Sequence, residues 1–226
     1  MLQLGILLFG VNYWLSYASE LYITSGLVAV AFSTIVFFNI LNGAIFLRTK
    51  IRPYVLVSAI IGFIGITLVF KNEILNFDFG SKNSQGFMMA LGGAFIASLG
   101  NITSARNQKN NLPVIQTNAF GMMYGAISMY IISLITGAPL VFDFSFSYII
   151  SLFYLSIFGS IIAFGAYLTL LGNIGADKAG YVTLVFPIIA LIFSTFFEDY
   201  QWTSTAIIGL FLITFGNITV LKKKKI

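Results

Sequence analysis

Long apolar stretches separated by short polar breaks make up almost the whole chain. A membrane-spanning helix needs about 20 mostly apolar residues, and this criterion selects eight stretches: 2–22, 27–47, 54–70, 86–105, 114–137, 146–171, 179–197 and 203–221. The breaks between them are rich in charged residues, Gly or Pro, as at Arg48 to Pro53 and Lys71 to Ser84. We therefore predict an all-α polytopic membrane protein with eight transmembrane helices and no soluble domain between them.

The composition agrees with this interpretation and excludes several function classes. Only 8% of the 226 residues are charged and 58% are hydrophobic, whereas a soluble domain carries about 25% charged residues. His and Cys are both absent, which excludes disulfides, thiolate zinc sites and catalysis that needs either residue. No other catalytic constellation is visible, so we predict a protein that is not an enzyme and has no cofactor and no metal.

The basic residues fall almost entirely on one side of the predicted topology. We call the membrane side that holds the N-terminus side A and the opposite side side B. Side B receives only Lys71 and Lys82. Side A receives ten basic residues: Arg48, Lys50, Arg52, Arg106, Lys109, Lys178 and Lys222 to Lys225. Positive loops remain in the cytoplasm. We therefore predict both termini in the cytoplasm, a bacterial inner (plasma) membrane location, and a basic cytoplasmic tail at 223–226. The tail carries most of the net charge of +5, so there is no basic groove for nucleic acid.

A shift of 151 residues superposes the first three predicted spans on the last three. Ile23 then falls on Ile174, Gly65 on Gly216, and Val69 on Val220. The first span of each set runs in the opposite direction through the membrane, so the two copies are inverted. Inverted repeats are typical of secondary transporters, which bind their solute between the repeats near the midplane.

The last three spans also contain an ordered series of glycines, a proline and an acidic residue. The segment Ile174 to Gly180 (IGADKAG) opens the seventh predicted span, Pro187 lies inside that span, Glu198 closes it, and Gly209 and Gly216 punctuate the last span. This run resembles the drug/metabolite transporter superfamily, in particular its EamA-type members. In the first repeat, Leu21 to Gly26 and Gly62/Gly65 match the same pattern more weakly. Val36 and Leu47 depart from it, because they occupy the positions where the pattern has Pro and Glu.

The resemblance implies a fold and a function. EamA-type proteins have ten helices in two inverted five-helix repeats and export or exchange small metabolites, amino acids or drugs. On this pattern residues 1–71 form a partial first repeat of three helices and residues 86–222 a complete second repeat of five, so the first repeat is truncated and lacks its first two helices. The implied partners are a small-molecule solute and the lipid bilayer. A truncated, non-transporting remnant or partial gene product and, less favoured, a membrane channel remain alternatives.

Polar side chains at membrane depth are the candidate substrate-binding residues, since burying them costs free energy unless they are satisfied. Asn39 and Asn42 share one face of the second span at positions i and i+3, and they are the first pair we select. The other candidates are Tyr13, Tyr17, Asn101, Asn118, Tyr124 and Tyr167. Amides and tyrosines suit zwitterionic or aromatic solutes, although the same groups could instead join helices by hydrogen bonds.

Three further features carry two interpretations each. Glu20, near the outer end of the first span, is a candidate for proton coupling or an interfacial acid. Pro187 is a candidate hinge or a static kink. The sequence Gly121-Met-Met-Tyr-Gly125 predicts close helix packing, within the monomer or, as the alternative, across a homodimer.

Overall fold

The computed structural model describes residues 1–137, 141–185, 189, 196 and 202–222. Every regular element in this part of the chain is a helix, and no strand occurs there. Four of these helices are long and apolar enough to cross a membrane: Ser25–Leu47, Lys82–Lys109, Val114–Thr136 and Phe146–Ile174. Two shorter apolar helices are Pro53–Val69 and Ser204–Val220. The prediction of an all-α polytopic membrane protein is confirmed at this level.

The N-terminal half contains α-helices and one π-helical segment. A single run of helix from Leu2 to Glu20 contains a π-helical segment, η1. The elements are α1 (Leu2–Leu4), η1 (Gly5–Val11), α2 (Asn12–Glu20), α3 (Ser25–Ser33), α4 (Ile35–Leu47), α5 (Pro53–Val69), α6 (Lys71–Leu75) and α7 (Ser81–Lys109). The Thr24 hydroxyl caps α3 by accepting from the Leu27 amide at 3.5 Å. Pro53 opens α5 at the position where its missing N–H costs nothing.

The C-terminal half repeats this mixture of helix types. Its elements are α8 (Val114–Thr136), α9 (Phe146–Tyr154), the π-helical η2 (Leu155–Ala163), α10 (Phe164–Ile174), α11 (Ala176–Ala179), the 3₁₀-helical η3 (Gly180–Leu184) and α13 (Ser204–Lys222). Gly175, with φ of 94°, separates α10 from α11. A side chain there would be strained, so glycine permits the sharp break between the two helices.

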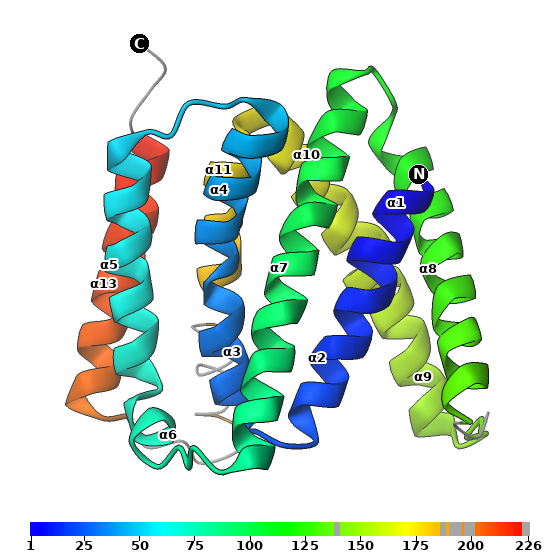
Figure 1. The fold of residues 1–226 in the computed structure, drawn as a ribbon, viewed down its shortest axis with the longest axis horizontal. Helices are drawn as coiled ribbons and strands as arrows, with labels where there is room; N and C mark the ends of the chain where they lie inside the picture. Colours follow the sequence, from blue (N-terminus) through cyan, green and yellow to red (C-terminus); the bar gives the residue numbers. More distant parts are fainter. Residues whose placement is uncertain (138–140, 186–188, 190–195, 197–201, 223–226) are drawn as a thin grey trace.

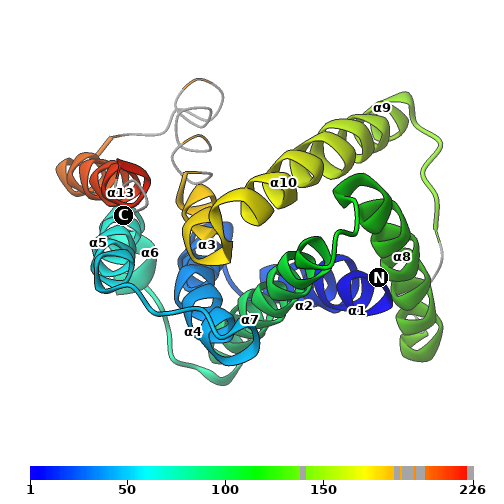
Figure 2. The same cartoon turned by 90° about the horizontal axis from the view of Figure 1, so that it is seen from above.

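The helices stand side by side as a bundle with α7 near its middle (Figure 1). The run α3–α4 and the run η1–α2 pack on α7, while α5 pairs with α13 at one end and α8 packs on η1 at the other. Seen from above, α10 approaches the centre of the bundle and α9 diverges from it (Figure 2). The start of α1 and the end of α13 lie at the same end of the bundle (Figure 1), as the predicted topology requires.

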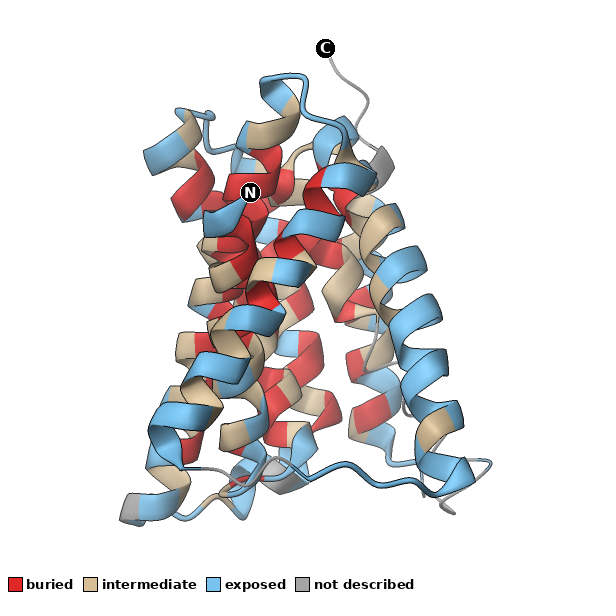
Figure 3. Cartoon of the chain, turned by 90° about the vertical axis from the view of Figure 1, so that its right-hand side faces the viewer, coloured by how far each residue is buried: buried red, intermediate tan, exposed pale blue. Residues whose placement is uncertain are grey.

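The core lies between the helices, and the outer faces are exposed (Figure 3). Its fully buried members include Leu4, Ile66, Leu168 and Leu171. The α7 helix contributes small residues that let its neighbours approach closely, namely Ala90, Ala94, Ala97 and Ser98. Outward-facing apolar side chains are expected here, because lipid tails are as apolar as leucine.

The pair Gly121/Gly125 packs within this chain. A Cβ atom at Gly125 would lie 2.6 Å from the Cβ of Phe9, and one at Gly121 would lie 3.3 Å from a ring carbon of Phe9. The two glycines thus bring α8 close to η1, which is the monomer-packing interpretation of this sequence.

The α5–α13 contact is formed by glycines whose partners correspond under the 151-residue shift. A Cβ atom at Gly65 would lie 2.7 Å from the carbonyl oxygen of Gly209, and one at Gly216 would lie 3.0 Å from that of Ser58. The shift turns Gly65 into Gly216 and Ser58 into Gly209 (216 − 65 = 209 − 58 = 151). The shift therefore converts the contact between Gly65 and Gly209 into the contact between Gly216 and Ser58.

The same shift also relates the boundaries of the elements. Helix α3 begins at Ser25 and α11 at Ala176, while α5 begins at Pro53 and α13 at Ser204, and both pairs are 151 residues apart (176 − 25 and 204 − 53). Shifted by 151, η1 covers 156–162, which lies within η2 (Leu155–Ala163). Because π-helix is rare in proteins, its coincidence at equivalent positions is a strong correspondence.

Candidate functional site

Buried amides meet where α4 crosses α7. Asn39 and Asn42 are 0% and 2% exposed, and both belong to the face of α4 that packs on its neighbours. The side-chain amide of Asn42 donates to the Ser98 hydroxyl of α7 at 3.0 Å. That of Asn39 donates to the backbone carbonyl of Ala176 at 3.2 Å, at the start of α11.

Asn101 of α7 joins these amides to α10. Its Nδ2 donates to the Asn39 Oδ1 at 3.3 Å and to the Tyr167 hydroxyl at 3.0 Å. We call Asn39, Asn42, Ser98, Asn101 and Tyr167 the amide cluster. Its members come from three elements, α4, α7 and α10, so the structure brings together four of the predicted residues, with Ser98 as a fifth.

One acceptor in the amide cluster is unused. Asn101 is 1% exposed, and its Oδ1 is buried with no hydrogen-bond partner in the described part of the chain. An unsatisfied buried polar group costs about 1–3 kcal/mol. A solute that donates a hydrogen bond to this oxygen would recover that free energy.

A cavity of about 300 Å³ leads from the side-A end of the bundle to Asn39. This volume is at the lower end of the range of small-molecule sites. We call it the side-A cavity; its lining is Asn39, Gly43, Leu47, Thr49, Ala105, Gln108, Lys109, Leu171, Gly172, Asn173, Gly175, Ala176 and Asp177. Lys109 and Asp177 are the charged members among these lining residues, and both stand near helix ends.

Gln108 is a lining residue that the sequence reasoning missed. Its Nε2 donates to the Leu168 carbonyl at 2.8 Å and to the Ser104 hydroxyl at 3.3 Å. It follows Asn101 by seven positions, which places the two on one helix face. That spacing was the available signal, but Gln108 lies beyond the apolar stretch that the sequence assigned to this span.

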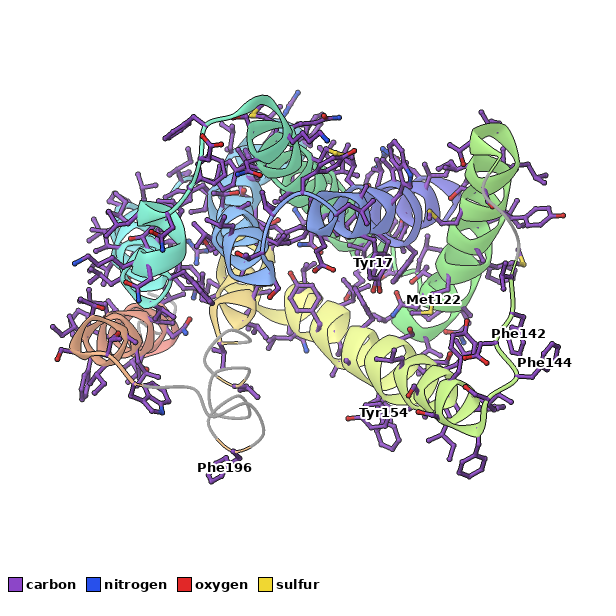
Figure 4. The ribbon with its side chains drawn as sticks, turned by 90° about the horizontal axis from the view of Figure 1, so that it is seen from below. Tyr17, Met122, Phe142, Phe144, Tyr154 and Phe196 are labelled. Carbon is purple, nitrogen blue, oxygen red and sulfur yellow. The ribbon has the colours of Figure 1, made fainter. Side chains whose placement is uncertain are left out.

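Aromatic rings from two helices adjoin the amide cluster. The Tyr13 ring stacks on Tyr17 with centroids 6.0 Å apart, and it contacts Phe164 of α10 at 6.5 Å. Tyr17 is 64% exposed and points toward the space between α2 and α10, on the same side as Met122 of α8 (Figure 4). Phe164 precedes Tyr167 by three residues, so the aromatic set and the amide cluster share one face of α10.

The remaining predicted residues lie apart from the amide cluster. Asn118 of α8 is buried, but its Oδ1 has no partner among the described residues. Tyr124 lies one to two turns further on, with its Cβ atom 2.7 Å from where a Cβ on Gly5 would stand. Tyr124 therefore packs against the N-terminal helical run. The predicted hinge, Pro187, lies outside the described residues.

Glu20 is the last residue of α2 and is exposed. It lines a second cavity, of about 650 Å³, at the side-B end of the bundle. The predicted alternatives for Glu20, proton coupling or an interfacial acid, both fit this position at the end of a helix.

Comparison with known proteins gives a family match over most of the chain. Residues 84–222 match the EamA-like transporter family. Over 215 residues the chain is 25% identical to an "Uncharacterized transporter" of Clostridium kluyveri, covering 95% of this chain and 69% of that protein. It is 28% identical over 223 residues to the "Uncharacterized inner membrane transporter YedA" of Escherichia coli, covering 95% and 70%.

A further relative and a solved structure agree with these matches. The "Uncharacterized transporter YoaV" of Bacillus subtilis is 26% identical over 212 residues, covering 93% of this chain and 71% of that protein. One crystal structure superposes with a TM-score of 0.76 at 16% identity, covering 92% of this chain and 71% of that one. At that identity the superposition shows a shared fold.

Proposed function

The chain belongs to the EamA-like transporter family, and on this premise we propose that it is a secondary transporter that moves a small organic solute by alternating access. The family membership confirms the resemblance inferred from the sequence and supports an integral membrane transporter. The proposal adds the solute class, a metabolite, amino acid or drug, and the mechanism.

The observation that carries the proposal is the Asn101 Oδ1, which has no hydrogen-bond partner among the described residues and belongs to the side chain bonded to Asn39. Asn39 lines the side-A cavity and is hydrogen-bonded to Asn101. A solute that enters from side A would therefore meet the amide of Asn39, and the Asn101 side chain bonded to that amide offers its Oδ1 as an acceptor. We assign solute binding to Asn39, Asn101 and Tyr167, with Asn42 as the residue that fixes α4 to α7.

We further propose eight spans built as an inverted repeat, with 1–71 and 86–222 as its two parts. The exchanged glycine contacts of α5 and α13 support this, and so do the coincident helix starts and π-helical segments. The contact of Tyr13 with Phe164 adds support: the two are 151 residues apart (164 − 13) and touch each other, as expected of equivalent residues beside a two-fold axis.

The proposed axis explains how the solute would be alternately exposed. Two inverted halves can exchange conformations, so an opening at one membrane face becomes an opening at the other while the binding site stays between them. We place side A in the cytoplasm, because ten of the twelve basic residues lie there. The name of the Escherichia coli relative, an inner membrane transporter, supports a location in the bacterial inner membrane.

Counterflow in proteoliposomes tests the proposal. The vesicles are loaded with one unlabelled amino acid or amine from a panel, and uptake of the labelled form is followed. Asn101→Ala should reduce exchange at least about tenfold, which corresponds to loss of about 1.4 kcal/mol of binding free energy. The matched control is Asn12→Ala, since Asn12 is also buried but donates only to Leu8 of its own helix, at 3.2 Å.

If both variants lose the same amount of solute exchange at equal membrane abundance, Asn101 has a structural role and does not bind the solute. Absence of exchange for every solute in the panel with the unmodified chain would contradict the transporter proposal. It would favour the non-transporting alternative.

A further inference from the structure

Two cavities in the described part of the chain lie at opposite ends of the bundle. The side-A cavity reaches Asn39 from the end where α4, α7 and α10 finish. The other, the side-B cavity, lies where α2 turns into α3, beside α6 and the start of α7. Its lining is Glu20, Leu21, Tyr22, Ile23, Thr24, Leu27, Asn72, Asn76, Phe77 and Asn83.

The two cavities are built on equivalent turns. Under the 151-residue shift, four side-B residues correspond to four side-A residues (171 − 20 = 151): Glu20, Leu21, Tyr22 and Thr24 to Leu171, Gly172, Asn173 and Gly175. Each turn links the first two helices of its set, and the two turns face opposite membrane sides. An inverted repeat that opens alternately to each side would use both turns as the walls of its two entrances.

The four equivalent positions all differ in residue type, and one of these differences changes the charge. Leu171 is buried at 0% exposure on side A, whereas Glu20 on side B is an exposed carboxylate. Among the residues that the structure describes, Glu20 is the one charged member of the side-B lining, which also holds three asparagines and the rings of Tyr22 and Phe77. Lys71 and Lys82 are neighbours of lining residues in the chain but are not part of the lining.

We propose that the side-B cavity is the outer vestibule of the transport path and that Glu20 makes it select solutes with a cationic amine. A carboxylate beside amide oxygens attracts an ammonium group and offers it acceptors, and adjacent rings favour a cation at their faces. The volume of about 650 Å³ is within the range of small-molecule sites. This inference rests on the proposed function, because only a transport path gives the two cavities a common role.

Equilibrium binding of three matched probes to the full chain in nanodiscs tests the inference. Tyramine carries an ammonium group, tyrosol is its neutral hydroxyl counterpart, and 4-hydroxyphenylacetate is the anionic one. Tyramine should bind more tightly than tyrosol by about threefold, since a solvent-accessible ion pair is worth about 0.2–1 kcal/mol, and 4-hydroxyphenylacetate should bind weakest.

Glu20→Gln should abolish the difference between tyramine and tyrosol. Asp78→Asn is the matched control, because Asp78 is a carboxylate on the same membrane side, lies outside the cavity lining, and its Oδ1 accepts from the Gly80 amide at 3.0 Å as an asparagine oxygen still can. This control should retain the preference for tyramine. Equal binding of the two probes by the unmodified chain, absence of binding, or an unchanged preference in Glu20→Gln overturns the inference.

Sidedness is measured separately, and it distinguishes this inference from the proposed function. The chain has no cysteine, so Thr24→Cys in the side-B cavity and Thr49→Cys in the side-A cavity can each be labelled alone. An impermeant maleimide should reach Cys at position 24 only from outside, and tyramine should slow that labelling. If counterflow occurs but tyramine slows maleimide labelling at neither position, the assignment of the side-B cavity as a vestibule is wrong. The proposal that the protein is a transporter then still stands.

Discussion

Leu4 and Leu155 are the same residue type at equivalent positions, and they have opposite environments. Both stand at the start of a π-helical segment and they are 151 residues apart (155 − 4). Leu4 is 0% exposed, whereas Leu155 is 59% exposed. The local sequence and the helix type are therefore insufficient to decide which one is buried.

The difference arises from the neighbours of each helix. The η1 segment lies between α7 and α8, and its glycines let α8 approach closely. The residues of α9 and η2, by contrast, include none that is buried in the described chain. A bilayer tolerates this exposure, because an apolar side chain against lipid tails loses no hydrophobic free energy. Equivalent helices can thus share a backbone geometry while only one of them is part of the core.

Replacing the two leucines should give the largest contrast. Leu4→Ala removes side-chain atoms from a filled core, which costs about 2–5 kcal/mol. Leu155→Ala removes them from an exposed face and should change stability by no more than about 0.5 kcal/mol. Thermal unfolding of the purified variants, followed by size-exclusion fluorescence, measures both. Similar losses in the two variants would mean that η2 is packed as tightly as η1.

Adding volume at a packed and at an exposed glycine should give a smaller contrast in the same direction. Gly125→Leu would place atoms at the 2.6 Å approach of α8 to Phe9, and overpacking costs about 1–3 kcal/mol. For Gly159→Leu in η2, the nearest atom to the new Cβ is 3.9 Å away, on Leu155. We expect the first variant to lower the unfolding midpoint and the second to leave it unchanged. A midpoint that falls for Gly159→Leu as well would contradict the open face of η2.

Aromatic coupling should give the smallest effect. A double-mutant cycle on Tyr13 and Phe164, each changed to Leu, should yield about 0.5–1.5 kcal/mol, because the rings join two helices. The control pair is Tyr154 and Phe158, stacked at 5.1 Å on consecutive turns of one helix. Their contact can persist when helices separate, so their coupling should stay below about 0.5 kcal/mol. Equal coupling in both cycles would remove the evidence for a tertiary contact at the proposed axis.

The sequence predicted the individual polar residues better than their grouping. Asn39 and Asn42 were selected as one face of a helix, and that face is buried as expected. Their partners, Ser98 and the Ala176 carbonyl, lie 56 and 137 residues away, and no periodicity within one helix could reveal such pairs. Asn118 shows the converse: it has the same residue type at similar depth, but it belongs to a helix that packs elsewhere.

The sequence by itself indicated the membrane location, the approximate ranges of helices in the described part of the chain, and the 151-residue correspondence. These follow from apolar length, from breaking residues and from the distribution of basic residues, which are properties of consecutive positions in the chain. The tertiary structure alone decided which of two equivalent helices is enclosed, which amides meet, and where the two cavities lie. Those outcomes depend on contacts between residues far apart in sequence, where packing against a particular neighbour sets burial and hydrogen bonding.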